Sequence, residues 1–350
     1  MTVATIIKEG GFQAMKWFLI VLLLLVGFFY FFPENSSRPE QKQEQIKDGN
    51  LQKEASASQG IMSLIGKSAE EVKKQFGEPV RIDYSAYDYK WWIYNHQPQT
   101  YVQIGILKNR VVTVYVCGEK VNVKPFQINQ PIKDIFNKIP IDSSIPVSLE
   151  NGTYRFELSE EDLTFQPLVK LGDVYAQIYV DRFTGRVSSV RFMDAETLIK
   201  MRPYELVYRG KLLAPKLLSV KEQKKVELAN AKQILDITNV VRQRHGVEMV
   251  RWDEKTSKAA YEHSKDMKEN QFFSHESPLH GDLKDRLVSS GVNFQIAGEN
   301  IAAQYVDGAA AVEGWLNSES HRETLLNEQF THLGVGVFDK YYTQNFIKPQ

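Results

Sequence analysis

The chain has 350 residues, of which 43% are hydrophobic and 25% are charged, so it is long enough for two ordinary domains with packed cores. Its 43 basic residues equal its 43 acidic residues, and this balance gives no reason to expect nucleic acid as a partner. The one cysteine, Cys117, excludes a disulfide within the chain and stands in a strand-like run that predicts a small buried side chain.

Residues 17–32 form an apolar run with no polar residue except Tyr30, and a membrane anchor over residues 15–32 is long enough, as a helix, to nearly cross a hydrocarbon core of about 30 Å. Lys8 and Lys16 flank this run on its N-terminal side, whereas the first charge after it is Glu34. The positive-inside rule therefore predicts that residues 1–14 are cytoplasmic and that the rest of the chain is outside the cell. The run ends in Phe-Phe-Pro without a small-x-small cleavage site, which favours an uncleaved membrane anchor over a cleaved signal peptide.

Residues 33–60 contain no aromatic residue and are rich in Gln, Glu, Lys and Ser, a composition that predicts a flexible stalk. Residues 61–205 have the pattern of a smaller α+β domain. A helix is predicted in "GKSAEEVKKQFGEP", where Ser68 is the N-cap and Glu71 stands at the capping-box spacing.

Three strand-like runs follow this helix, and a second predicted helix at "QPIKDIFNKIP" precedes three more. A helix followed by three strands, found twice, suggests an internal duplication of the domain. The six runs are "YDYKWWIYN", "TYVQIGIL", "RVVTVYV", "TYRFEL", "VYAQIYV" and "RVSSVRFM". Trp91 and Trp92 could mark a binding face, but aromatic residues in strands are more often part of a core.

Residues 206–224 are expected to link this domain to a second one at residues 225–350. Helical periodicity runs from Lys221 to Gly246, and another helix is predicted to follow Asp253. The chain closes with "LGVGVFDKYYTQNFI", whose alternation on both sides of Asp-Lys predicts a hairpin.

Six of the seven histidines lie between residues 245 and 332. Three polar residues in this region stand in apolar surroundings: His275 in "NQFFSHESP", Glu299 in "AGENIA" and His321 in "EGWLNSESHRETLL". Each alone has a structural alternative, since His275 could cap a helix, Glu299 could accept from the N–H groups of a following helix, and His321 could stack on Trp315. A histidine at a helix start is expected to stay neutral, which is the state that a metal ligand needs.

Taken together, the motifs of residues 228–347 resemble the bacterial branch of the CAP superfamily, the group of cysteine-rich secretory, antigen and pathogenesis-related proteins that is also called the SCP-like extracellular domain. They occur in the family's order and include "QFFSH", "AGENIA", "WLNSESHRETLL", "HLGVGV" and "YYTQNF". The resemblance implies an α-β-α sandwich, with an antiparallel sheet between helical layers. Residues 61–205 resemble the domain that accompanies CAP domains in membrane-anchored proteins of bacilli.

The resemblance also implies a central cleft, which the family lines with two histidines and two glutamates. By motif, these positions correspond to His275, Glu299 and His321 for three of the four residues. The fourth position holds Ser318, as is usual in the bacterial branch, and Glu313 is a candidate to replace the missing glutamate.

Two imidazoles and a carboxylate in one cleft suit zinc or another divalent metal, with His275, His321 and Glu299 as the candidate ligands. The glutamate could instead orient the imidazoles from outside the ligand shell, and a purely structural role of the cluster also stays open. We interpret the chain as a membrane-anchored binding module of the cell envelope, with an unknown ligand or partner protein, rather than as an enzyme.

The alternative is a metal-dependent hydrolase that acts on cell-wall or secreted substrates with Glu299 as general base. No H-E-x-x-H motif supports that alternative. A serine hydrolase built on Ser318 or Ser320 with His321 would need an orienting acid.

Overall fold

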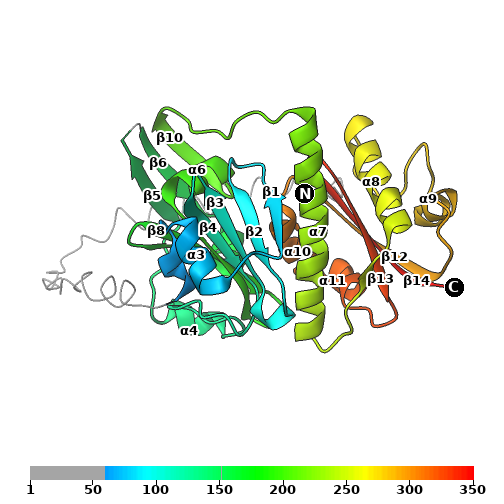
Figure 1. Ribbon diagram of the computed structural model, residues 1–350, viewed down its shortest axis with the longest axis horizontal. Coiled ribbons are helices and arrows are strands. Elements are labelled where there is room, and N and C mark those ends of the chain that lie inside the picture. Colours follow the sequence, from blue (N-terminus) through cyan, green and yellow to red (C-terminus); the bar gives the residue numbers. More distant parts are fainter. Residues whose placement is uncertain (1–59, 151) are drawn as a thin grey trace, which may run out of the picture. The chain divides into compact units, whose positions relative to one another are not determined.

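The structure of the protein is a computed structural model that describes residues 60–150 and 152–350. The predicted anchor and the predicted stalk, apart from Gly60, lie outside the described residues. Within the described part, no helix is long and apolar enough to cross a membrane. Residues 60–350 belong to one compact unit, in which two sheets of different sizes are separated by the long helix α7 (Val220–Arg244) (Figure 1).

The N-terminal half is built on a seven-stranded sheet in the order β1-β2-β3-β4-β9-β8-β7, with every neighbouring pair antiparallel. Its strands are β1 (Arg81–Tyr84), β2 (Lys90–Tyr94), β3 (Val102–Leu107), β4 (Arg110–Val116), β7 (Leu168–Leu171), β8 (Val174–Asp181) and β9 (Arg186–Met193). All six strand-like runs of the sequence contain a strand, whereas the short strands β1 and β7 were not predicted.

The two parts of this sheet share features that the predicted duplication would give, but the repeat of a helix and three strands is not regular. One part has four strands and the other three, and the first two strands after the second helix lie in another sheet. Helix α3 (Ala69–Phe76) precedes one half and helix α4 (Ile132–Phe136) precedes the other. Ser68, before α3, bridges to Arg110 at the start of β4, and Pro131, before α4, bridges to Arg186 at the start of β9. Strands β4 and β9 then pair with each other at the centre of the sheet.

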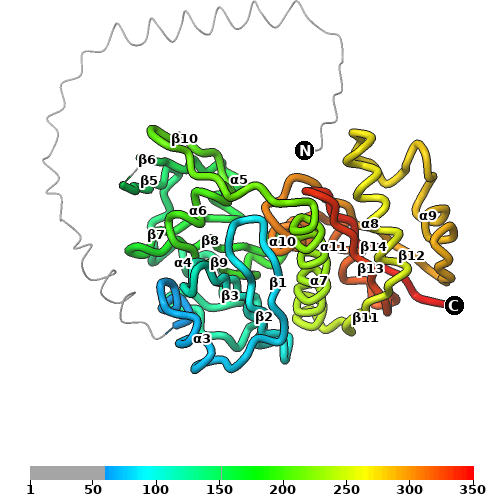
Figure 2. Tube along the Cα trace, turned by 45° about the horizontal axis from the view of Figure 1, so that its top comes forward, coloured from blue at the N-terminus to red at the C-terminus, as the bar shows by residue number. Residues whose placement is uncertain are grey.

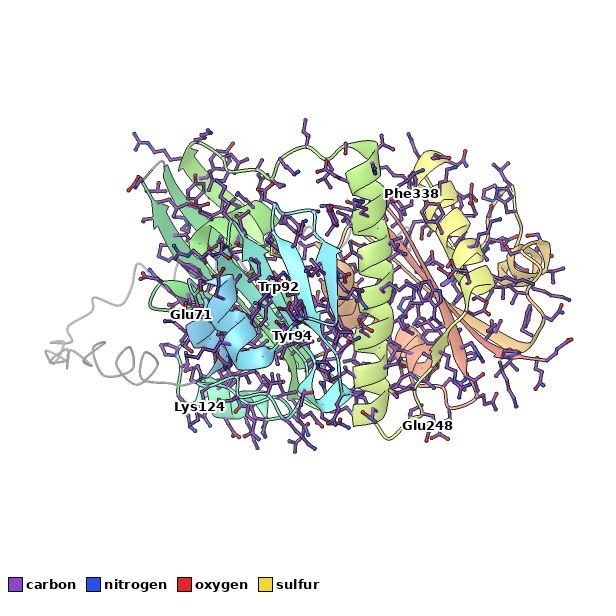
Figure 3. All side chains as sticks on the ribbon, in the orientation of Figure 1. Glu71, Trp92, Tyr94, Lys124, Glu248 and Phe338 are labelled. Carbon is purple, nitrogen blue, oxygen red and sulfur yellow. The ribbon has the colours of Figure 1, made fainter. Side chains whose placement is uncertain are left out.

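Local signals in the sequence placed the first helix correctly. Ser68 caps α3 in a capping box with Glu71, and Gly77 ends the helix. Trp91 and Trp92 are both buried, on opposite faces of β2, which confirms their assignment to the core. Figure 3 marks Trp92 on this strand, close to α3.

A second, three-stranded sheet lies beside the first and has the order β10-β6-β5. Its strands are β5 (Ser144–Leu149), β6 (Gly152–Glu157) and β10 (Glu205–Gly210), and the short helices η1 (Ile61–Leu64), η2 (Pro98–Thr100), α5 (Glu160–Phe165) and α6 (Ala195–Met201) complete this half. The segment expected as a linker is therefore shorter than predicted. Its residues 206–210 pair with β6, because β6 needs a partner on its second edge, and α7 already begins at Val220.

The C-terminal half is the predicted α-β-α sandwich. Its sheet has the order β11-β13-β14-β12, with the parallel β11 at one edge. Helix α8 packs on β13 and β14, while α7 and α10 pack together on the other side of the sheet (Figures 1 and 2). The elements are β11 (Arg251–Trp252), α8 (Glu254–Glu269), α9 (Leu283–Ser289), β12 (Phe294–Ala303), α10 (Gly308–Leu316), α11 (Glu319–Leu325), β13 (His332–Phe338) and β14 (Tyr341–Pro349).

Close contact between α8 and β13 depends on glycine. A Cβ atom on Gly336 would lie 1.9 Å from the backbone nitrogen of Tyr261, a distance that no packed structure allows. Ser257 and Ser264 of α8 donate hydrogen bonds to the carbonyls of Val335 and Gly336. The glycines of "LGVGV" therefore let the helix rest directly on the strand.

The two halves share one apolar core. A single cluster of buried side chains includes Trp91 and Tyr115 from the first half and Ile234 and Trp315 from the second. Polar contacts cross the same boundary, and the pair Arg191–Asp307 joins the halves at 2.8 Å with both side chains buried.

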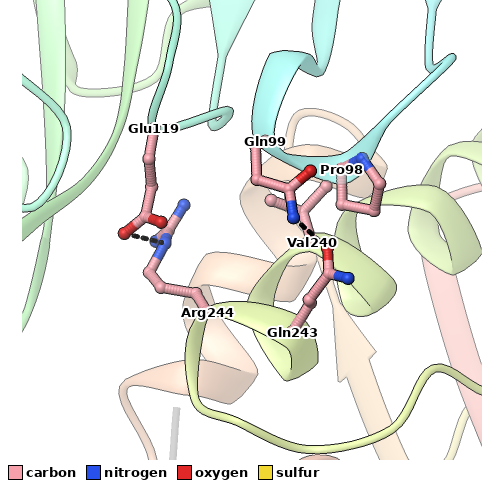
Figure 4. Close-up of a pocket in the computed structure, with 6 residues that line it drawn as sticks. All are labelled: Pro98, Gln99, Glu119, Val240, Gln243 and Arg244. Atoms are coloured by element: carbon pink, nitrogen blue, oxygen red, sulfur yellow. Dashed lines mark hydrogen bonds and ion pairs between the residues drawn. The ribbon is translucent and has the colours of Figure 1, made fainter.

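At one end of α7, Gln99 of η2 donates to Gln243 at 2.9 Å, and Arg244 lies 3.7 Å from Glu119, beside a cavity of about 30 Å³ (Figure 4). Polar side chains thus fix the boundary between the halves at its edge as well as in its core.

Candidate functional site

His275 lies in the loop between α8 and α9, and it is not a helix cap. Helix α8 ends at Glu269 with Asn270 as its C-cap, so His275 comes after the helix is complete. Its Nδ1 lies 2.9 Å from Oε1 of Glu299. A carboxylate can only accept, so Nδ1 carries the proton and Nε2 keeps a free lone pair. The His275 side chain is 56% exposed, which leaves this nitrogen open to a ligand.

Glu299 is buried in the sheet, with 3% of its side chain exposed. It lies on β12 directly opposite Asn345 of β14. Its Oε2 accepts from Arg286 at 2.6 Å and, with the Asn345 amide turned so that its nitrogen faces the carboxylate, from Asn345 at 2.9 Å. Both oxygens of Glu299 are therefore occupied, and the carboxylate orients the His275 imidazole.

His321, in the first turn of α11, completes with His275 and Glu299 the group of side chains that is called the cleft here. Its ring centroid lies 6.4 Å from that of His275, with the ring planes 39° apart. Its Nδ1 lies 2.8 Å from the Ser318 hydroxyl. Burial, followed by the charge of His275, lowers the pKa of His321 from 6.5. The expectation of a neutral imidazole agrees with this direction, but the cause is burial and a neighbouring imidazole, not the helix start.

Two residues that support the cleft were not predicted. Arg286 of α9 ties the cleft loop together, because its Nη1 donates to the carbonyls of His275 and Gly281 while its Nη2 binds Glu299. His263 of α8 is buried, and its Nε2 donates to the Ser274 carbonyl at 3.1 Å. Burial lowers the pKa of His263, and Glu299 opposes that effect. The sequence contains one signal for Arg286: it stands next to Leu287 on the apolar face of its helix, where a charged residue needs a buried partner.

Glu313 does not lie in the cleft. It is fully buried between the two halves of the molecule, where it accepts from Tyr115 at 3.2 Å and from Ser189. Burial raises its pKa, although these hydrogen bonds oppose the shift. The prediction that Glu313 replaces the missing cleft glutamate is therefore wrong, because its side of α10 faces the N-terminal sheet. Ser318, by contrast, is in the cleft and contacts His321.

The side chains of the cleft that could hold a metal ion are two imidazoles, not two imidazoles and a carboxylate. Over residues 60–150 and 152–350, no group of three or more His, Cys, Asp or Glu side chains is placed to hold a metal ion. Glu299 is poorly placed to be a third ligand, because its oxygens already accept from His275, Arg286 and Asn345. The imidazoles of His275 and His321 fit a metal better, because each is held through Nδ1, which directs Nε2 to the ligand.

The same geometry weighs against hydrolysis. A general base must be able to take a proton from water, but the Glu299 side chain is buried and already accepts three hydrogen bonds. The Ser318–His321 pair has the distance of a nucleophile and its base. The carboxylate of this cleft, however, is bonded to His275 rather than to His321, so the orienting acid of a triad is not in place.

Replacing His275 by alanine should raise the pKa of His321. The variant removes the neighbouring imidazole, whose charge disfavours protonation of His321. A histidine-selective NMR titration of wild type and variant measures the shift, with His96→Ala as a control at an exposed position in the N-terminal half. If the pKa of His321 is the same in His275→Ala as in wild type, the two imidazoles do not share a site.

Comparisons with known proteins agree with the two halves seen in the structure. Residues 65–204 match the family model for the CAP-associated N-terminal domain, and residues 235–347 match that for the cysteine-rich secretory protein family. The membrane protein YlbC of Bacillus subtilis is 51% identical over 314 residues, which are 90% of each chain. The protein YkwD of the same species is 40% identical over 121 residues, which are 34% of this chain and 47% of YkwD.

Solved structures extend the match to the arrangement of the whole described part. An extracellular SCP-domain protein from Bacillus anthracis has a TM-score of 0.80 at 45% identity and covers 91% of this chain and 100% of its own. A cysteine-rich secretory protein from Staphylococcus aureus has a TM-score of 0.73 at 27% identity and covers 83% and 95%. The chain thus belongs to the family of CAP-domain proteins that carry a CAP-associated N-terminal domain.

Proposed function

We propose that the protein is an envelope-exposed binding module whose cleft captures a ligand through the imidazoles of His275 and His321. The observation that carries this proposal is the pair of imidazoles whose Nδ1 atoms are already bonded, to Glu299 and to Ser318. Glu299 keeps the proton of His275 on Nδ1, and in the tautomer in which His321 Nδ1 donates to Ser318 both Nε2 lone pairs are free to bind a divalent cation. Zinc binds imidazole nitrogen at about 2.0–2.1 Å.

Such a site binds weakly and exchangeably, because two protein ligands leave the other positions of a tetrahedral zinc open. The open positions suit capture of a second molecule that brings its own oxygen or nitrogen ligands. Glu299 serves this function from outside the ligand shell by fixing the tautomer and direction of His275. Binding is expected to weaken in acid, when His321 gains a proton and can no longer act as a ligand. Because burial lowers the pKa of His321, this loss falls below the ordinary imidazole value of about 6.5.

A zinc titration of the full chain by calorimetry tests this function. Wild type should bind one zinc ion per chain. His275→Ala and His321→Ala should each weaken zinc binding by at least about tenfold, because losing even a residue that only supports a metal ligand weakens affinity by about that factor. His96→Ala, on the exposed side of the N-terminal half, should bind as wild type does. A wild type that takes up no zinc, or an equal loss in His96→Ala, would refute metal capture at this cleft.

The membrane attachment completes the proposal. We infer that residues 15–32 cross the membrane once, with the domains outside, because Lys8 and Lys16 flank the apolar run on one side only. The identity of 51% with a Bacillus membrane protein supports membrane association.

External protease on wall-stripped intact cells should cut within residues 33–59 and release a soluble fragment that contains both halves. A tag placed at the N-terminus should stay protected until the cells are opened. Protection of the domains in intact cells would reverse the inferred orientation.

A further inference from the structure

The end of β8 and the turn after it, in the N-terminal half, contact the segment that joins α10 to α11. Asn317 directly follows α10, and both polar atoms of its side-chain amide are hydrogen-bonded to this region. Its Oδ1 accepts from the backbone N–H of Arg182 at 2.8 Å, and its Nδ2 donates to the carbonyl of Val180 at 2.9 Å. A neighbouring strand would likewise accept from a backbone N–H and donate to a backbone carbonyl. The Asn317 amide therefore takes the place of a strand partner at the end of β8.

A second contact follows one turn later. Arg322 of α11 reaches Asp181 with an N–O distance of 3.0 Å, and both side chains are largely buried. Its guanidinium lies 4.9 Å from the ring centre of Phe183, in the same turn, and it also donates to the Leu316 carbonyl at 3.2 Å. A planar guanidinium that is paired, stacked and bonded at once has little freedom to move.

Asn317 and Arg322 stand on either side of the two cleft residues in this segment. Ser318 directly follows Asn317, and His321 directly precedes Arg322. Ser318 is the N-cap residue of α11, yet its hydroxyl makes no capping bond and contacts His321 instead. Any shift of the first turn of α11 therefore moves the His321 imidazole and its Ser318 partner together.

We propose that the CAP-associated domain positions His321 of the cleft by clamping the α10–α11 junction at Asn317 and Arg322. This assigns a role to the N-terminal half that the cleft alone does not require. His275 is fixed from within the C-terminal half, by Glu299 and Arg286. His321 is held from both halves, because Asn300 of β12 donates to its carbonyl at 3.1 Å while Asn317 and Arg322 contact the N-terminal half. The distance between the two imidazoles thus depends on how the two halves are docked. The effect of the clamp on zinc binding rests on the function proposed above, whereas the effect of the clamp on the stability of α11 does not.

The boundary contains a matched contact that is not part of the clamp. Gln99 of η2 and Gln243 of α7 form a side-chain hydrogen bond of 2.9 Å between the same two halves (Figure 4). Neither residue belongs to the α10–α11 segment, so Gln99→Ala removes a boundary contact without touching the clamp.

The test compares Asn317→Ala with Gln99→Ala in the full chain by hydrogen exchange and by zinc titration. In Asn317→Ala the amides of Glu319–Leu325 should exchange at least about tenfold faster while those of α8 keep their protection, because opening is local when only local contacts are lost. The dissociation constant for zinc should rise by about tenfold, as for other outer-shell partners. Gln99→Ala should change neither quantity.

Unchanged protection of α11 in Asn317→Ala, or the same loss in Gln99→Ala, would overturn the clamp. If Asn317→Ala does not fold, Arg322→Lys gives the same comparison, since lysine keeps the charge opposite Asp181 but loses the stacking on Phe183 and the planar hydrogen-bond fork. Absence of zinc binding in wild type together with faster exchange of α11 in the variant would refute the proposed ligand and leave the clamp intact.

Discussion

Replacing Asp307 by alanine should destabilise the protein by about 3–5 kcal/mol, the cost of breaking a buried ion pair on one side. Arg191, its partner at 2.8 Å, is completely buried in the centre of β9, so no water can replace the lost carboxylate. Asp307 also caps α10 through the backbone N–H of Ala310 at 3.0 Å, and loss of such a cap typically adds about 1 kcal/mol. Urea unfolding at neutral pH measures the total.

A double-mutant cycle built from Arg191→Met, Asp307→Asn and their combination separates the pair from the cap. Arg191→Met alone leaves Asp307 without its charge partner, whereas Arg191→Met with Asp307→Asn removes both charges and leaves a side chain able to cap α10. The double variant should be more stable than Asp307→Ala, because no uncompensated charge stays buried. Additive effects of the single substitutions would show that the pair does not couple the two halves.

Loss of the Arg191–Asp307 pair should also affect the candidate site. Arg191 belongs to the N-terminal sheet and Asp307 to the loop before α10, the helix that leads to the α10–α11 junction. Weakening the boundary therefore acts on the side of the cleft that carries His321, not on the side that carries His275.

The sequence predicts local features of this fold better than its contacts between distant segments. The capping box at Ser68 and the two-residue turn at Asp339 and Lys340 depend on neighbouring residues, and both occur as predicted. Strands β1 and β7 were missed because they are short. Strand β10 was missed because its pairing with β6 joins segments far apart in the chain.

The candidate site shows the same division. His275, Glu299 and His321 stand in motifs that mark them, and the structure brings them together. Glu313 stands in the same helical segment as the site, but its direction is decided by the N-terminal sheet, which a helical periodicity cannot reveal. Asn345 reaches Glu299 through the register of β12 and β14, and that register is a property of the folded sheet.

Replacing Arg286 by methionine should destabilise the protein by about 3–5 kcal/mol and also weaken zinc binding. Arg286 and Glu299 are both almost completely buried, so the variant leaves a carboxylate that has lost its charge partner. The carbonyls of His275 and Gly281 lose their donor at the same time, which frees the loop that carries His275. Urea unfolding measures the first effect and calorimetric zinc titration the second.

Combining Arg286→Met with Glu299→Gln should separate stability from binding. The double variant no longer buries an unpaired charge, so it should recover a large part of the lost stability. Zinc affinity should stay low, because a glutamine amide does not hold the His275 Nδ1 proton as a carboxylate does, and the loop donor is still missing. Full recovery of zinc binding in the double variant would mean that Glu299 and Arg286 stabilise the fold without orienting the imidazole. Loss of zinc affinity at restored stability would instead establish that this buried pair holds His275 in the direction the ligand requires.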